Sequence, residues 1–175
     1  MGYLRFVLRL ALLVTALIFC VPFYYIWRVL RLPNPWPRTF LKIAAFACGA
    51  RVNIVGTPIR RDVFFISNHL SWVDIAILGG HSGTAFVSKE EIGKWPIIGW
   101  LCRLNDTVFV SRSNRMGIAQ QINQLRDALE ETWAITIFPE GTTTDGSMLL
   151  PFKAPLLKVL EPPPPGILVQ QIFIN

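Results

Sequence analysis

The chain has 175 residues, of which 52% are hydrophobic and 16% charged. This length allows one ordinary domain plus an appendage. The hydrophobic fraction is high for a soluble domain, so a membrane segment is expected. All of the net charge of +6 lies in residues 1–50, which lack acidic residues, whereas residues 51–175 are neutral. The neutral part lacks a basic stripe, which argues against nucleic-acid binding. Basic residues beside an apolar run instead favour an anionic membrane surface as a partner.

Residues 10–27 form an apolar run without a charged residue. Its 18 residues are close to the lower limit of about 17 to 25 that cross a hydrocarbon core. A cleaved signal peptide is the alternative. The run ends in Tyr24, Tyr25 and Trp27, followed by Arg28, which is typical of a membrane interface rather than of a small-residue cleavage site. We therefore predict a retained membrane anchor.

A second apolar segment, residues 38–50, follows a proline-rich break and is too short to span a membrane. It is expected to lie in the interface or to return as the second arm of a helical hairpin. The basic residues between Arg28 and Lys42 favour a cytoplasmic location for the rest of the chain. Residues 1–50 are thus predicted to be the anchor, and residues 51–175 an α/β domain that is incomplete at its C-terminus.

From residue 51 onward, short apolar strands alternate with helical patterns. This alternation predicts an α/β fold whose sheet is mixed but mainly parallel and is flanked by helices. The expected strands are residues 52–55, 63–67, 84–88, 107–111, 134–138 and 167–174. The expected helices are residues 72–79, 90–103, 115–131 and 153–160.

His69 and Asp74 follow the strand predicted at residues 63–67. In a continuous helix they would point in directions about 140° apart, so they can meet only if His69 precedes the helix and Asp74 lies in its first turn. Ser71 is a suitable N-cap, and Asp74 then completes a capping box. In the alternative role, Asp74 accepts a hydrogen bond from one imidazole nitrogen and leaves the other free to take a proton.

Two further polar segments follow predicted strands. Residues 138–142, Phe-Pro-Glu-Gly-Thr, form a turn at which Gly141 and Thr142 can offer a backbone amide and a hydroxyl to an anion. Glu140 is expected to point inward, and Arg112 follows the strand at 107–111 as a solvated charge or as a phosphate ligand.

Taken together and in this order, the three segments resemble the conserved blocks of the glycerolipid acyltransferases, the family that contains the 1-acylglycerol-3-phosphate (lysophosphatidic acid) acyltransferases. The resemblance covers roughly residues 50 to 175. It implies that His69 is a general base oriented by Asp74 and that an acceptor hydroxyl attacks the thioester of an acyl carrier protein or of coenzyme A. It also implies acceptor binding by four residues, Arg112, Glu140, Gly141 and Thr142. The implied reaction makes phosphatidic acid from a membrane lysolipid and needs no cofactor besides the acyl thioester.

Three positions depart from the family pattern: Asp106, Thr143 and Gln171. Thr143 stands where many members have arginine, and this loss of a cation raises the chance of another acceptor, such as lyso-ornithine lipid. A non-catalytic lipid-binding module and a hydrolase are the remaining alternatives, although the chain has no Gly-x-Ser-x-Gly elbow for a nucleophilic serine.

No metal site is expected. His81 could join His69 and Asp74 as a ligand, but no His-Glu-x-x-His motif or cysteine cluster supports one. The three cysteines have no short spacing, so a disulfide framework is not predicted and a reducing compartment is the simplest interpretation.

Overall fold

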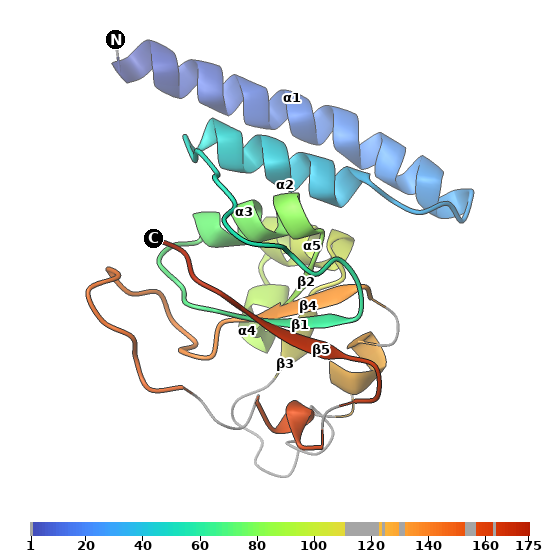
Figure 1. The fold of residues 1–175 in the computed structure, drawn as a ribbon. Helices are drawn as coiled ribbons and strands as arrows, with labels where there is room; N and C mark the ends of the chain where they lie inside the picture. The colour runs from blue at the N-terminus through green and yellow to red at the C-terminus, as the bar shows by residue number, and fades with distance from the viewer. Residues whose placement is uncertain (1, 111–122, 124, 130–131, 153–156, 163) are drawn as a thin grey trace. The chain divides into compact units, whose positions relative to one another are not determined.

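A computed structural model of the chain contains two compact units (Figure 1). The helical unit comprises Met1–Gly56 and Val73–Gly83, and the sheet unit comprises Thr57–Trp72 and Thr84–Asn175. The structure describes residues 2–110, 123, 125–129, 132–152, 157–162 and 164–175.

Three helices make up the helical unit: α1 (Gly2–Val29), α2 (Trp36–Ala47) and α3 (Val73–Ser82). α2 runs back along α1, so the two form an antiparallel helical hairpin (Figure 1). Of the two arrangements expected for residues 38–50, the structure shows the hairpin arm, and its place in a membrane stays a prediction. α1 begins and ends beyond the 18-residue apolar run and continues through Pro22.

Aromatic rings join the two arms of the hairpin near their connecting loop. The Trp36 ring at the start of α2 stacks on Phe23, with ring centroids 4.8 Å apart, and meets Trp27 edge-on at 5.5 Å. In the loop, the Asn34 amide donates to the Tyr24 carbonyl, and its oxygen accepts from the Trp36 amide. These contacts stabilise the loop that joins α1 to α2.

Small residues bring α2 and α3 into close contact. Ala44, Ala45 and Ala76 form a buried cluster between these helices. A Cβ atom on Gly80 would lie 2.7 Å from the backbone of Lys42, so the approach requires glycine. The Arg38 guanidinium donates to the Gly80 carbonyl at 3.3 Å and also to the His81 carbonyl, which satisfies carbonyl groups at the end of α3.

Gly80→Ala is expected to destabilise the helical unit. In an open helix this change stabilises by about 0.5 to 1 kcal/mol, but overpacking against backbone costs roughly 1 to 3 kcal/mol. Overpacking should dominate because the Lys42 backbone cannot rotate away. Thermal unfolding in detergent measures the effect, with Gly2→Ala as the control because nothing lies within 4 Å of a Cβ there. Equal or higher stability of Gly80→Ala would contradict the close packing.

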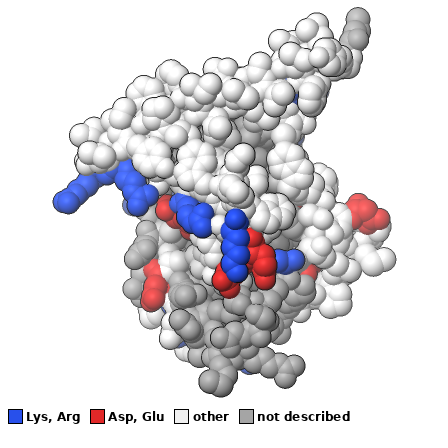
Figure 2. Space-filling model, turned by 180° about the vertical axis from the view of Figure 1, so that it is seen from behind, with Lys and Arg blue, Asp and Glu red and all other residues white. Residues whose placement is uncertain are grey.

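α1 has the length and composition of a membrane helix. Among the described residues, it is the one helix that is long and apolar enough to cross a membrane, and only 11% of its most apolar window is buried. A core helix of a soluble protein would be mostly buried, so that explanation does not fit. Most of the α1 surface in Figure 2 is free of charged side chains.

The sheet unit contains five strands: β1 (Val63–Ser67), β2 (Ala85–Lys89), β3 (Val108–Val110), β4 (Ala134–Ile137) and β5 (Leu168–Ile172). Their order in the sheet is β3-β2-β4-β1-β5, and each neighbouring pair is parallel. The expectation of an α/β fold with a mainly parallel sheet is thus confirmed. β4 is buried along its whole length, as expected for a central parallel strand.

The prediction of a single helix at residues 90–103 is wrong in one respect, because the structure has two helices there. α4 (Glu90–Gly93) ends before Pro96, which occupies the first position of α5 (Pro96–Leu104). Proline has no backbone N–H and fits the first turn of a helix but not its interior.

Two other predicted helices are described only in part. Within 115–131, residues 123 and 125–129 are helical, and Leu125 and Leu129 are buried in the main core. Ile118 and Ile122 lie outside the described residues. Within 153–160, the structure describes a short 3₁₀ helix, Lys158–Leu160, that follows Leu157.

The strand predicted at residues 52–55 is also wrong. These residues form no strand, and Val52, Ile54 and Val55 are exposed. An alternating apolar pattern forms a strand only where a neighbouring strand supplies hydrogen bonds.

Candidate active site

The candidate active site of the sheet unit lies where β1 and β4 end. These strands are parallel neighbours, with Ile66 paired to Ile137. The segments that follow them therefore leave the sheet at the same edge. The segment after β1 carries His69, and the segment after β4 carries Glu140.

The imidazole of His69 stacks on an aromatic ring. Its centroid lies 4.0 Å from that of Phe138, and the planes differ by 17°. Phe138 in turn lies nearly parallel to Phe86 of β2, at 6.1 Å. Because Phe138 contacts the imidazole through its face, both ring nitrogens lie at the edge of the imidazole, where hydrogen bonds form. The stacking therefore fixes the plane of the imidazole without using its nitrogens.

A β-turn places Glu140. The Gly141 amide donates to the Phe138 carbonyl at 2.9 Å, with Pro139 at the second position of the turn. Proline favours this position because its φ is fixed near the required value. Gly141 has a φ of 68°, a conformation that glycine adopts at little cost. The Pro-Glu-Gly sequence thus explains both the turn and the inward direction of Glu140.

Glu140 is buried, and its carboxylate accepts hydrogen bonds from two backbone amides. It is 1% exposed, and its Oε1 accepts from the His69 amide at 3.2 Å. Its Oε2 accepts from the Leu150 amide at 3.0 Å. The carboxylate therefore links the segment that carries His69 to the far end of the loop after β4.

Other hydrogen bonds hold the backbone around His69. Its carbonyl accepts from the Thr144 amide at 2.9 Å. The preceding residue, Asn68, exchanges two hydrogen bonds of 2.8 Å with the backbone of Ile174, beyond β5. The loop after β4 thus holds both peptide groups that flank His69, through Glu140 and Thr144, while the Asn68 side chain ties the same segment to the chain beyond β5.

Within the loop after β4, the Asp145 carboxylate stabilises a short turn. Asp145 accepts hydrogen bonds from the hydroxyl and the amide of Ser147. The side-chain hydrogen bond, followed by the backbone one, lowers the pKa of Asp145, which is fully exposed. The Asp145 side chain therefore holds the exposed part of the loop through its hydrogen bonds to Ser147.

The other predicted site residues have different locations. Gly141 and Thr142 follow Glu140 in the same loop, and Thr142 is exposed. Asp74 belongs to the helical unit, in the first turn of α3, and is 2% exposed. Its pairing with His69 stays a prediction. Arg112 lies outside the described residues, and β3 is separated from β1 by β2 and β4.

Sequence reasoning missed three contributors to the site. The sequence places Phe138 at a strand end and in the 138–142 turn but assigns it no role, although an aromatic residue before Pro-Glu-Gly is a recognisable signal. Thr144 and Leu150 contribute backbone amides, which carry no sequence signal. Among the described residues, no group of three or more His, Cys, Asp or Glu side chains could hold a metal ion.

The model of the family described as "Acyltransferase" matches residues 51–169, which include every candidate site residue. The chain belongs to the acyltransferase family. This family membership confirms the resemblance found in the sequence.

Curated relatives of this acyltransferase-family chain are acyltransferases of lysolipids. A lyso-ornithine lipid O-acyltransferase from Brucella abortus is 35% identical over 160 residues, which are 89% of this chain and 59% of the relative. A 1-acyl-sn-glycerol-3-phosphate acyltransferase from Neisseria gonorrhoeae is 32% identical over 116 residues, 66% of this chain and 46% of the relative. The chain spans about half the length of the curated relatives it matches.

A solved structure shows the same fold. The 1-acyl-sn-glycerophosphate (LPA) acyltransferase from Thermotoga maritima superposes with a TM-score of 0.65 at 24% identity. The match covers 92% of this acyltransferase-family chain and 71% of the Thermotoga chain.

Proposed function

We propose that the chain transfers a fatty acyl group from a thioester to a hydroxyl of a lysolipid at a membrane. The observation that carries this proposal is His69, held by its stacking on Phe138 and by backbone hydrogen bonds at the end of β1, within the segment that matches the family model. A fixed imidazole at this edge of a parallel sheet suits a general base.

In the proposed reaction, an imidazole nitrogen of His69 takes the proton of the acceptor hydroxyl. The hydroxyl oxygen attacks the thioester carbonyl carbon, the carbon–sulfur bond breaks, and the thiolate leaves and takes up a proton. Asp74 orients the imidazole, and Gly141, Thr142 and Arg112 bind the acceptor. The donor is acyl carrier protein or coenzyme A carrying the acyl group.

Lyso-ornithine lipid is the acceptor that we favour. Thr143 stands where, according to the family resemblance, many members have an arginine that suits a phosphate ligand, and ornithine carries no phosphate. Four curated relatives that are 35% to 38% identical to the chain are lyso-ornithine lipid O-acyltransferases. 1-Acylglycerol-3-phosphate, the acceptor expected from the resemblance, is the second candidate. Two relatives described as 1-acyl-sn-glycerol-3-phosphate acyltransferases are each 32% identical to the chain.

We further propose that α1 anchors the chain in the membrane and that the sheet unit faces the cytoplasm. α1 is apolar and largely unburied, and residues 1–50, which carry the whole net charge of +6, suit the anionic cytoplasmic leaflet. An anchored enzyme meets its lysolipid within the leaflet and its thioester donor in water.

The test uses the purified chain with isotopically labelled acyl-coenzyme A or acyl carrier protein and a panel of lysolipids. Mass spectrometry should detect labelled ornithine lipid, and the product should be lost in His69→Ala. Labelled phosphatidic acid alone would reverse the choice of acceptor. Release of free fatty acid without an acceptor would indicate a hydrolase, and absence of any labelled product would indicate a non-catalytic module.

A further inference from the structure

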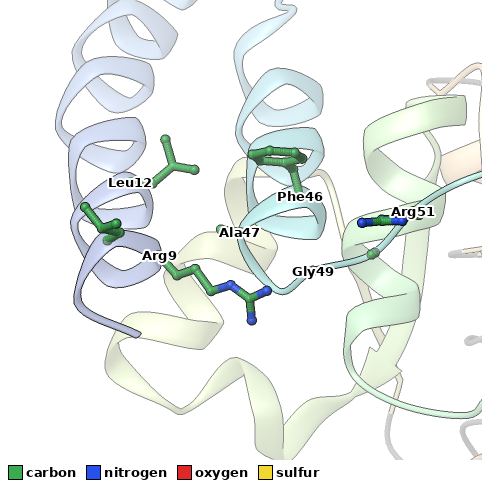
Figure 3. Close-up of a pocket in the computed structure, with 8 residues that line it drawn as sticks. Arg9, Leu12, Phe46, Ala47, Gly49 and Arg51 are labelled. Atoms are coloured by element: carbon green, nitrogen blue, oxygen red, sulfur yellow. The ribbon is translucent and has the colours of Figure 1, made fainter. Parts of the chain in front are cut away.

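A pocket of about 340 Å³ lies between α1 and the end of α2 within the helical unit (Figure 3). This volume is at the lower end of the roughly 300 to 1,000 Å³ that is usual for ligand pockets. It suits a lipid headgroup and the first part of its chains better than a whole two-chain lipid. The lining residues are Leu8, Arg9, Leu12, Phe46, Ala47, Gly49, Ala50 and Arg51.

Two arginines reach this pocket from different segments. Arg9 extends from α1 toward Gly49, and Arg51 lies on the segment that follows α2 (Figure 3). No acidic side chain lines the pocket, and residues 1–56 contain none. Two guanidinium groups that line one pocket with no acidic side chain in the same lining repel each other, so an anion between them is favourable.

The remaining walls are apolar. Leu8 and Leu12 come from α1 and Phe46 from α2, and the Phe46 side chain is 72% exposed. The apolar walls continue into the exposed apolar surface of α1. A ligand that suits both parts has an anionic group joined to hydrocarbon, as a phospholipid does. Basic pockets between membrane helices are known to bind such headgroups.

We propose that the Arg9–Arg51 pocket binds the phosphate group of an anionic membrane phospholipid. Each guanidinium donates hydrogen bonds to phosphate oxygens, and the glycerol and first chain carbons lie against Leu8, Leu12 and Phe46. This lipid is a bound structural partner, distinct from the lysolipid that is acylated. The proposal uses no residue of the proposed reaction, so it can fail or hold independently of that reaction.

The probe is phosphatidylglycerol, which is neither acceptor nor product of the proposed reaction. The purified full chain in a neutral detergent is titrated with phosphatidylglycerol, phosphatidylcholine or inorganic phosphate, and bound lipid is counted by native mass spectrometry. Phosphatidylglycerol should bind more tightly than the zwitterionic phosphatidylcholine. Arg9→Gln and Arg51→Gln should each weaken its binding roughly tenfold, the loss of one charge-assisted contact.

Matched controls remove the same charge elsewhere. Arg5→Gln lies on the same helix as Arg9, and Arg60→Gln lies in an exposed segment beyond Arg51; neither residue lines the pocket. Both control variants should bind phosphatidylglycerol as the original chain does. Equal weakening in the controls would overturn the proposal, and so would displacement of the lipid by inorganic phosphate at equal concentration. Because Arg51 lies outside the helices, its variant tests binding even if Arg9→Gln loosens the hairpin.

Discussion

His69→Ala is expected to lower the rate of acyl transfer by about 10² to 10⁴-fold, the usual contribution of a positioned general base. The imidazole stacks on Phe138 and is held through its own backbone, so its nitrogens are placed before substrate binds. Turnover of purified protein with labelled donor and lysolipid measures the loss. Because the acceptor is bound by other groups, its KM should change less than kcat.

Two further variants separate proton transfer from packing. His69→Phe keeps an aromatic ring to stack on Phe138 but has no proton acceptor, so it should be as inactive as His69→Ala and more stable. His81, the other histidine, bonds through Nδ1 to the Ile77 carbonyl of its own helix, and His81→Ala should retain activity within a few fold. Activity in His69→Phe near that of the original chain would contradict a general-base role.

The sequence was sufficient to predict the parallel sheet and the strand ends that carry polar residues, and it left a helical hairpin as one of two expected arrangements. Those features depend on local patterns: buried apolar runs for β1 and β4, and two apolar segments joined by a proline-rich loop. Strand order was not predictable, because β4 lies between β1 and β2 although it comes later in the chain. That order is what places Glu140 beside His69.

The role of Glu140 was predicted only in part. Its inward direction follows from the Pro139–Gly141 turn, but the resemblance assigned it to acceptor binding. In the structure both carboxylate oxygens accept from backbone amides that are distant in sequence. A sequence does not reveal such partners, since every residue except proline carries the same amide.

Glu140→Ala is expected to destabilise the sheet unit by roughly 2 to 6 kcal/mol, because two amide donors lose their acceptor and each lost partner costs about 1 to 3 kcal/mol. That is a large fraction of a total stability of about 5 to 15 kcal/mol. Glu140→Gln keeps one acceptor oxygen but places an NH₂ group against an amide donor, so it should be intermediate. Thermal or denaturant unfolding in detergent measures both.

Kinetics of Glu140→Gln then distinguish the two roles. If Glu140 holds the backbone of His69, both kcat and the stability of the sheet unit fall, while KM for the lysolipid stays close to its original value. If it binds the acceptor, KM rises and the stability changes little. Asp145→Asn is the matched control, since Asp145 is an exposed acid in the same loop whose carboxylate accepts hydrogen bonds from nearby Ser147. It should change neither quantity appreciably, because solvent replaces the hydrogen bonds that an exposed carboxylate loses.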